Sequence, residues 1–112
     1  MHEMTIAVNI VDIAVQTAQA ADAKKINKIT VEVGALSGVV PESLEFCFGE
    51  ACKGTIAEQA ELELIRIPAT ARCTSCGFTF ETDQFLNICP KCGHEVLARG
   101  GQELQVKTIN VD

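Results

Sequence analysis

Four cysteines in two closely spaced pairs are the feature that most constrains the fold of this chain. The pairs read Cys73-Thr-Ser-Cys76-Gly and Cys89-Pro-Lys-Cys92-Gly, and twelve residues separate Cys76 from Cys89. A Cys-x-x-Cys turn can direct two thiolates at one point, and the glycine after each pair lets the backbone turn with a positive φ. Two such turns supply the four sulfur ligands of a tetrahedral metal ion. The spacing therefore predicts a metal site made of Cys73, Cys76, Cys89 and Cys92.

Zinc is the metal that this ligand set favours. Four thiolates fill the coordination sphere and leave no open position for water or substrate, so the site is expected to be structural. Iron in the same four-thiolate geometry is the better rival. Disulfides fit a reducing compartment poorly, and the thioredoxin-like context of a redox Cys-x-x-Cys is missing. Cys47 and Cys52 are five residues apart on a predicted helix, and we expect them to be small buried apolar residues.

Length and charge exclude several classes of protein. The chain has 112 residues, of which 47% are hydrophobic, so either one ordinary domain or a core with a small appendage is expected. Its formal charge of −6 and its lack of a dense Lys/Arg cluster argue against nucleic-acid binding. No run of about 18 apolar residues is present, so no membrane span is expected. Residues 1–23 lack the basic start of a signal peptide, and we expect a cytoplasmic protein.

Apolar periodicity predicts two helices. Over residues 3–21, apolar side chains recur at helical spacing in two stripes, Met4, Val8, Val11, Val15 and Ala18, then Ile6, Ile10 and Ile13. This helix is expected to be buried on more than one side. Pro41 opens the second helix, in which Leu44, Phe48, Ala51 and Cys52 form the apolar stripe, and Gly54 ends it.

Alternation of apolar and polar residues predicts three strands, at residues 28–34, 61–67 and 103–111. In the second and third of these the alternation changes phase, which suggests that they are neighbours in the sheet. The twelve residues between the cysteine pairs are expected to form a hairpin, with Phe78 and Phe80 on its first strand and Phe85 and Leu86 on its return.

These elements predict an α+β fold of two helices packed on a small β-sheet, with an inserted zinc-ribbon-like module. Pro68 and Gly100-Gly101 flank the cysteine segment. The expected division is therefore an α+β domain of residues 1–68 plus 102–112, and an inserted four-cysteine domain of residues 69–101.

The amino terminus is a second candidate metal site. The chain begins Met1-His2-Glu3, and the large His2 side chain favours retention of Met1. The terminal amine, the imidazole and the backbone nitrogens between them can surround a metal in one plane, which suits Ni(II) and Cu(II). Glu3 could add an oxygen ligand or offset the charge of the cation. Two observations favour the alternative of a solvated histidine: terminal residues are usually solvated, and a helix N-terminus disfavours cations.

Three motifs together resemble the HypA/HybF family. They are the Met1–Met4 start, the segment Val33-Gly34-Ala35-Leu36-Ser37-Gly38-Val39, and the cysteine module with its Cys89-Pro-Lys-Cys92-Gly turn. The resemblance covers essentially the whole chain. It implies a nickel metallochaperone that binds Ni(II) at its N-terminus and delivers it for maturation of [NiFe]-hydrogenase. Some members of the family also serve urease.

The resemblance also implies residues and partners. It assigns nickel, the cargo, to His2, with the Met1 amine and Glu3 nearby, and structural zinc to the four cysteines. The implied partners are a GTPase accessory protein and the hydrogenase large subunit. The oligomeric state, monomer or homodimer, stays open. His94 could tune the zinc site, but a solvated histidine is the simpler interpretation.

Two rival functions remain. A zinc-ribbon adaptor for nucleic acid is disfavoured by the acidic charge and by the absence of Trp and Tyr. A thiol oxidoreductase is disfavoured by a closed zinc site. An enzyme is not expected, because no nucleophile–base pair and no open metal position can be identified.

Overall fold

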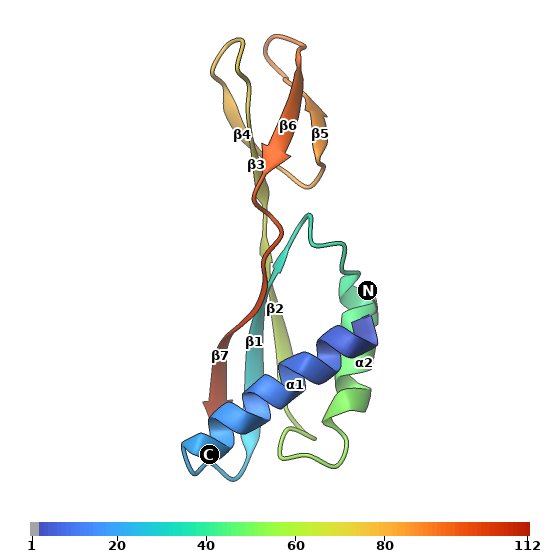
Figure 1. The fold of residues 1–112 in the computed structure, drawn as a ribbon, viewed down its shortest axis with the longest axis vertical. Coiled ribbons are helices and arrows are strands. Elements are labelled where there is room, and N and C mark those ends of the chain that lie inside the picture. The colour runs from blue at the N-terminus through green and yellow to red at the C-terminus, as the bar shows by residue number, and fades with distance from the viewer. Residues whose placement is uncertain (1–2) are drawn as a thin grey trace. The chain divides into compact units, whose positions relative to one another are not determined.

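The computed structural model describes residues 3–112, and Met1 and His2 lie outside the described residues (Figure 1). The elements are α1 (Glu3–Ala20), β1 (Ile26–Gly34), α2 (Pro41–Cys52), β2 (Glu61–Ile67), β3 (Ala69–Arg72), β4 (Thr79–Thr82), β5 (Leu86–Ile88), β6 (Glu95–Arg99) and β7 (Leu104–Val111). They form two compact units. The helical unit contains the residues up to Glu32, Val39–Ile65 and Gln105–Asp112. The cysteine unit contains Val33–Gly38 and Arg66–Leu104.

The first helix has the predicted length but buries a narrower face than predicted. Its buried residues are Ile6, Ala7, Ile10, Val11, Ala14 and Ala18. Met4, Val8 and Ile13 are exposed, so the prediction of burial on several sides was wrong. The buried face contains three alanines with no exposed area, and such small side chains let neighbouring elements approach closely. Among residues 3–112, no helix is long and apolar enough to cross a membrane.

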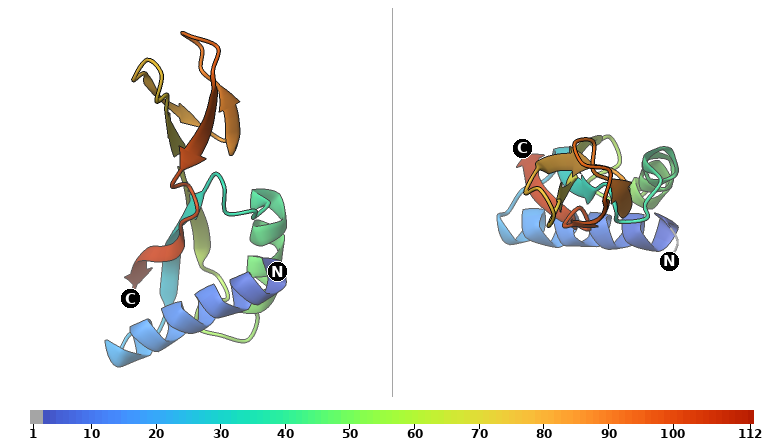
Figure 2. Two further views of the ribbon diagram at one scale, coloured as in Figure 1. Left: turned by 45° about the horizontal axis from the view of Figure 1, so that its top comes forward. Right: turned by 90° about the horizontal axis from the view of Figure 1, so that it is seen from above.

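The second helix begins and ends as its sequence predicts. Pro41 stands in its first turn, where a missing N–H costs no helical hydrogen bond. Leu44, Phe48 and Cys52 are buried at four-residue spacing, and α2 packs against α1 (Figures 1 and 2). Burial raises the pKa of the Cys52 thiol to about 11, so this cysteine is a neutral core residue, as predicted. Cys47 is only half-buried.

The first sheet has the order β2-β1-β7. Hydrogen bonds from Ile26 to Ile56 and from Ala35 to Ile67 show that β1 and β2 run in the same direction. Their connection through α2 is thus a β-α-β crossover, which parallel strands require. Asn27 bonds Asn110, and Glu32 accepts from Gln105, so β7 runs antiparallel to β1.

The prediction that the strands at 61–67 and 103–111 are neighbours was wrong. Both flank β1, which occupies the centre of the sheet. Ile26, Ile29 and Val31 of β1 have no exposed area, whereas β2 and β7 keep exposed positions along their length. The most completely buried strand takes the central place, because a central strand has neighbours on both edges.

The second sheet has the order β4-β3-β6-β5. The predicted hairpin between the cysteine pairs is absent here, because β4 and β5 lie at opposite edges of this sheet. Instead β3 pairs with β4 around the first cysteine pair, and β5 pairs with β6 around the second. The two hairpins join through β3 and β6, where Thr70 faces Arg99 and Ala71 faces Ala98.

Two glycines let the backbone segments of the cysteine unit pass close together. The Gly34 N–H donates to the Glu103 carbonyl at 2.6 Å. A Cβ at Gly34 would overlap the Gly101 backbone, and Gly101 itself has a φ of 71° and lies against Ala69. Any side chain at Gly34 would therefore force the backbone apart.

Replacing Gly34 with alanine should lower the free energy of unfolding by about 1–3 kcal/mol, the usual cost of overpacking. Urea-induced unfolding measures the change. Gly49→Ala is the matched control, because a Cβ at Gly49 within α2 would meet nothing within 4 Å. Alanine there should stabilise the helix by about 0.5–1 kcal/mol. Equal stabilities of the two variants would contradict the close approach at Gly34.

Candidate metal centre

The two cysteine turns have the same backbone geometry. In the first, the Gly77 N–H donates to the Cys73 carbonyl at 2.8 Å, and the Cys73 N–H donates to the Phe78 carbonyl at 2.9 Å. In the second, Gly93 bonds Cys89 at 2.9 Å, and Cys89 bonds His94 at 2.8 Å. Gly77 and Gly93 both have a φ of 80°, which an L side chain rarely adopts. The glycine after each pair is thus required by the turn that presents the thiols.

The structure brings all four predicted cysteines together. Their sulfur atoms lie within 4.8 Å of one another. The Cys73 and Cys92 sulfurs are 3.3 Å apart, and those of Cys76 and Cys89 are 3.7 Å apart. Four sulfurs at 2.3 Å from a tetrahedral zinc ion would be about 3.8 Å from one another. The cluster therefore fits a tetrathiolate zinc ion with small adjustments, and all six cysteines are free of disulfides.

The pKa values of the clustered thiols favour a bound cation. Hydrogen bonds, of which that from the Cys76 backbone N–H is the largest, lower the pKa of the Cys73 thiol to about 6. The pKa of Cys92 is raised to about 12. The hydrogen bond from the His94 backbone N–H lowers this pKa, but hydrogen bonding with Cys73 and burial raise it, and the net shift is upward. Without a cation, one ionised sulfur thus keeps its neighbour protonated. A divalent ion removes this conflict, because it stabilises all four thiolates at once.

A thin apolar shell covers one side of the cluster. Cys73 and Cys89 are buried with Ala71 and Val96, while Cys76 and Cys92 are exposed. Phe78 and Phe80 pack against this core with ring centroids 5.8 Å apart. The Lys91 ammonium lies 4.8 Å from the centre of the Phe78 ring. A lysine beside four thiolates offsets part of the negative charge that a zinc tetrathiolate keeps.

His94 lies next to the cluster. Its Nδ1 is 3.2 Å from the Cys92 sulfur, and its ring is exposed. A ring N–H at this position can hydrogen-bond a metal-bound thiolate from outside the coordination sphere. Among residues 3–112, the four cysteines form the only group suited to hold a metal, and Cys47 and Cys52 do not belong to it. His2, the predicted nickel ligand, lies outside the described residues.

Sequence reasoning missed one contact near the amino terminus. A Glu3 carboxylate oxygen accepts a hydrogen bond from the Val40 backbone N–H at 3.3 Å. Val40 is the N-cap residue of α2 and has no side chain that could cap the helix. Glu3 thus accepts, from α1, the hydrogen bond of the N-cap N–H that a Glu or Gln in the first turn of the same helix accepts in a capping box. No sequence signal could reveal a cap that comes from 37 positions away.

The purified protein should contain one zinc ion per chain, held by the four cysteines. Cys76→Ser or Cys92→Ser should remove most of the zinc and unfold the cysteine unit, because metal coordination stabilises the fold of such small modules. Metal analysis and circular dichroism measure both effects, and Cys47→Ser is the control that should keep the metal. Full zinc content in the Cys92→Ser variant, or iron in place of zinc, would contradict the assignment.

Comparison with known proteins gives a consistent result. The family model described as hydrogenase/urease nickel incorporation, metallochaperone, HypA matches residues 1–111. The chain is 42% identical to hydrogenase maturation factor HypA of Chlorobaculum parvum and 40% identical to that of Geobacter sulfurreducens, and each alignment covers 100% of both chains. The fold resembles the solution structure of the Ni metallochaperone HypA from Helicobacter pylori, with a TM-score of 0.69, 19% identity and coverage of 99% and 97%. The chain belongs to the HypA family of metallochaperones for nickel incorporation into hydrogenase and urease.

Proposed function

We propose that this protein binds Ni(II) through His2 and delivers it for the maturation of [NiFe]-hydrogenase, while its four cysteines hold a structural zinc ion. The observation that carries the proposal is the family match over residues 1–111, together with relatives named hydrogenase maturation factor HypA that align over their full length. Urease is a second recipient that the family description allows.

The chemistry of the cysteine cluster supports two separate metal sites. Four thiolates complete the sphere of a zinc ion and hold it firmly. A carrier needs the opposite property, because its cargo must leave. A site of one imidazole, a terminal amine and backbone nitrogens offers fewer anionic ligands and stays open to exchange. His2 supplies the imidazole of such a site.

Glu3 makes a cation at the start of α1 more favourable. The N-terminus of a helix carries partial positive charge, which repels Ni(II). The Glu3 carboxylate lies at this end and also accepts the hydrogen bond from Val40. Its charge offsets the helix dipole, and its contact with the N-terminus of α2 fixes the position of the residue that follows His2.

Each proposed metal site belongs to its own domain of the chain. Residues 1–68 plus 102–112 form the nickel-binding domain, and residues 69–101 form the inserted zinc domain. The compact cysteine unit includes residues 69–101 in full, which supports the second part. The compact units differ from this division mainly in grouping Val33–Gly38 with the cysteine unit.

The protein acts as a carrier and not as an enzyme, in keeping with the metallochaperone description of its family. Hydrogenase maturation implies contact with the maturation machinery. We assign the GTPase accessory protein and the hydrogenase large subunit as partners, and place this work in the cytoplasm, where thiols stay reduced for zinc. The charge of −6 disfavours nucleic acid as a further partner. Sedimentation would decide between a monomer and a homodimer.

His2→Ala should abolish stoichiometric nickel binding, because it removes the imidazole from a site with few side-chain ligands. Calorimetric titration of untagged, zinc-loaded protein with Ni(II) measures the change. His94→Ala is the matched control, since these are the two histidines of the chain. It should keep nickel affinity unchanged.

Both variants should keep their zinc content, which shows that the fold is intact. Nickel affinity equal to wild type in His2→Ala would refute the assignment of His2. Loss of nickel in His94→Ala instead would move the cargo site to the cysteine unit. A tag fused ahead of Met1 should also weaken binding, because it removes the free amine.

A further inference from the structure

The four cysteines of the metal cluster differ in their access to solvent. Cys76 and Cys92 are exposed, whereas Cys73 and Cys89 are buried. Zinc ligation keeps all four sulfurs as thiolates, and the thiolate is the form of cysteine that oxidants attack. Access therefore decides which sulfur reacts first with a small oxidant, and it favours Cys76 and Cys92.

The two exposed cysteines have different neighbours. The Cys92 sulfur accepts a hydrogen bond from the His94 backbone N–H, and the His94 ring Nδ1 lies 3.2 Å from it. A thiolate can only accept, so the adjacent Nδ1 carries the ring proton and donates it. Hydrogen bonds that make a thiolate less basic also make it less nucleophilic, by about threefold for a pKa lower by one.

The ring of His94 therefore protects Cys92 from oxidation. Among residues 3–112, His94 is the only histidine, so no other imidazole protects Cys76 in the same way. Cys76 is thus the more reactive of the two exposed thiolates.

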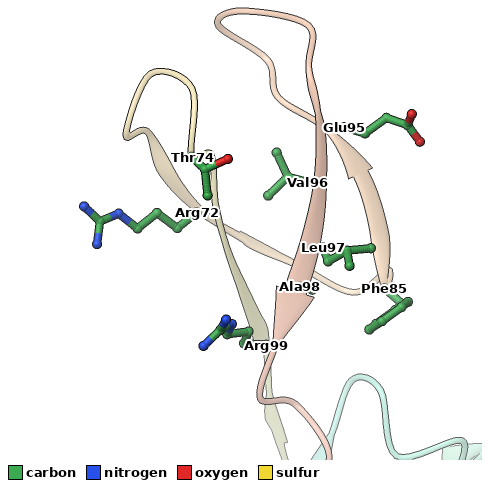
Figure 3. A pocket seen from close by; sticks show the side chains of 8 residues that line it. All are labelled: Arg72, Thr74, Phe85, Glu95, Val96, Leu97, Ala98 and Arg99. Atoms are coloured by element: carbon green, nitrogen blue, oxygen red, sulfur yellow. The ribbon is translucent and has the colours of Figure 1, made fainter.

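A hollow open to solvent reaches the turn that carries Cys76. Its lining residues come from β3, from β6 and from this turn, namely Arg72, Cys73, Thr74, Gly77 and Arg99. Arg72, Thr74 and Arg99 also line the neighbouring hollow of the same sheet (Figure 3). A small molecule such as hydrogen peroxide can therefore reach the first cysteine turn from this side.

The Cys76 sulfur has a partner for a disulfide on the other turn. The Cys89 sulfur lies 3.7 Å from it, so a disulfide bond requires only a small movement of the two side chains. An exposed thiolate next to a second cysteine that can close a disulfide is typical of peroxide-sensitive sites. A Cys76–Cys89 bond would take one ligand from each turn and leave the cluster two of its four zinc ligands.

We infer that Cys76 is a site of oxidation by hydrogen peroxide, and that the disulfide it then forms with Cys89 releases zinc from the cysteine unit. The Cys76 thiolate attacks one peroxide oxygen, the O–O bond breaks, hydroxide leaves, and Cys76 becomes a sulfenic acid. The Cys89 thiolate then attacks the Cys76 sulfur, the S–O bond breaks, and a second hydroxide leaves. The two thiolates together lose two electrons, and one peroxide gains them.

Oxidation at this position removes what stabilises the cysteine unit. Binding of a structural zinc ion contributes directly to the folding of such modules, so release of zinc should unfold this one. A thiol reductant that opens the disulfide regenerates both thiolates, and zinc can bind again. The inference rests on the zinc site and uses no residue assigned to nickel.

The test uses full-length, zinc-loaded protein that carries Cys47→Ser, so that the half-buried Cys47 thiol cannot react. A small excess of hydrogen peroxide should release one zinc ion per chain, which a chromogenic chelator measures. Dimedone, which traps sulfenic acids, should label Cys76 before Cys92. Without dimedone, peptide mapping should find the Cys76–Cys89 disulfide, and dithiothreitol with added zinc should restore the zinc content.

A change at His94 tests why Cys76 reacts first. His94→Ala should raise dimedone labelling of Cys92 at least about threefold, because it removes the ring N–H beside that sulfur. His94→Asn is the matched control, since its amide N–H can take the place of the Nδ1–H, and it should be labelled like wild type. Both variants should contain one zinc ion per chain before peroxide is added, which shows that the cluster is intact.

Three results would overturn the inference. The first is full retention of zinc at a peroxide concentration that oxidises Cys47 in the wild-type chain. The second is labelling of Cys92 before Cys76, or a disulfide between the two cysteines of one turn. The third is a loss of zinc that dithiothreitol and added zinc do not reverse. Nickel binding by His2→Ala bears on none of these outcomes, so the two proposals fail separately.

Discussion

The cysteine unit depends on its four thiolates more than on its apolar core. Its buried side chains are small, namely Val33, Ala69, Ala71, Cys73, Cys89, Val96 and Ala98, and two of these belong to the predicted metal site. So small a core buries little apolar area, and small modules of this kind need a metal or a disulfide. Sulfur atoms within 4.8 Å of one another meet that need only if a cation lies between them. The paired turns, their glycines and the two phenylalanines all serve to hold this arrangement.

A complete coordination sphere has a consequence for function. It can stabilise the unit, but it offers no position from which a second metal could be taken up and released. The cargo of a nickel carrier must then bind elsewhere, and within residues 3–112 the cysteines are the only group that could hold a metal. We therefore propose the amino terminus as the place for nickel. The hydrogen bond between Glu3 and Val40 shows how the start of α1 is fixed against α2 next to that place.

Much of the fold could be predicted from the sequence because its signals were local. Pro41 and the glycines of the cysteine turns have conformational preferences that act within a few residues. The spacing of the four cysteines likewise predicts one tetrahedral metal site. The wrong predictions concerned which strands pair with each other when they are far apart in the sequence. The alternation of Phe78 and Phe80 with polar residues predicts a hairpin within the twelve-residue spacer, yet in the structure β4 pairs with β3 and β5 pairs with β6, each across its own cysteine turn.

Other features had weak or no sequence signals. Strands β3 and β6 were missed because Ala69, Ala71 and Ala98 are only weakly hydrophobic, although Ala71 packs in the same buried cluster as Cys73 and Cys89. The buried face of α1 was misjudged because Ala7 and Ala14, which belong to neither predicted stripe, are buried, whereas Met4, Val8 and Ile13 are exposed.

The central claim is that zinc and nickel occupy separate sites with different ligands. X-ray absorption spectroscopy on protein loaded with both metals tests it most directly, because zinc and nickel have separate X-ray absorption edges and each can be measured in the presence of the other. The account predicts a zinc spectrum of four sulfur ligands at about 2.3 Å. It predicts a nickel spectrum of nitrogen and oxygen ligands with imidazole scattering and no sulfur. Sulfur ligands on nickel, or nitrogen ligands on zinc, would contradict it.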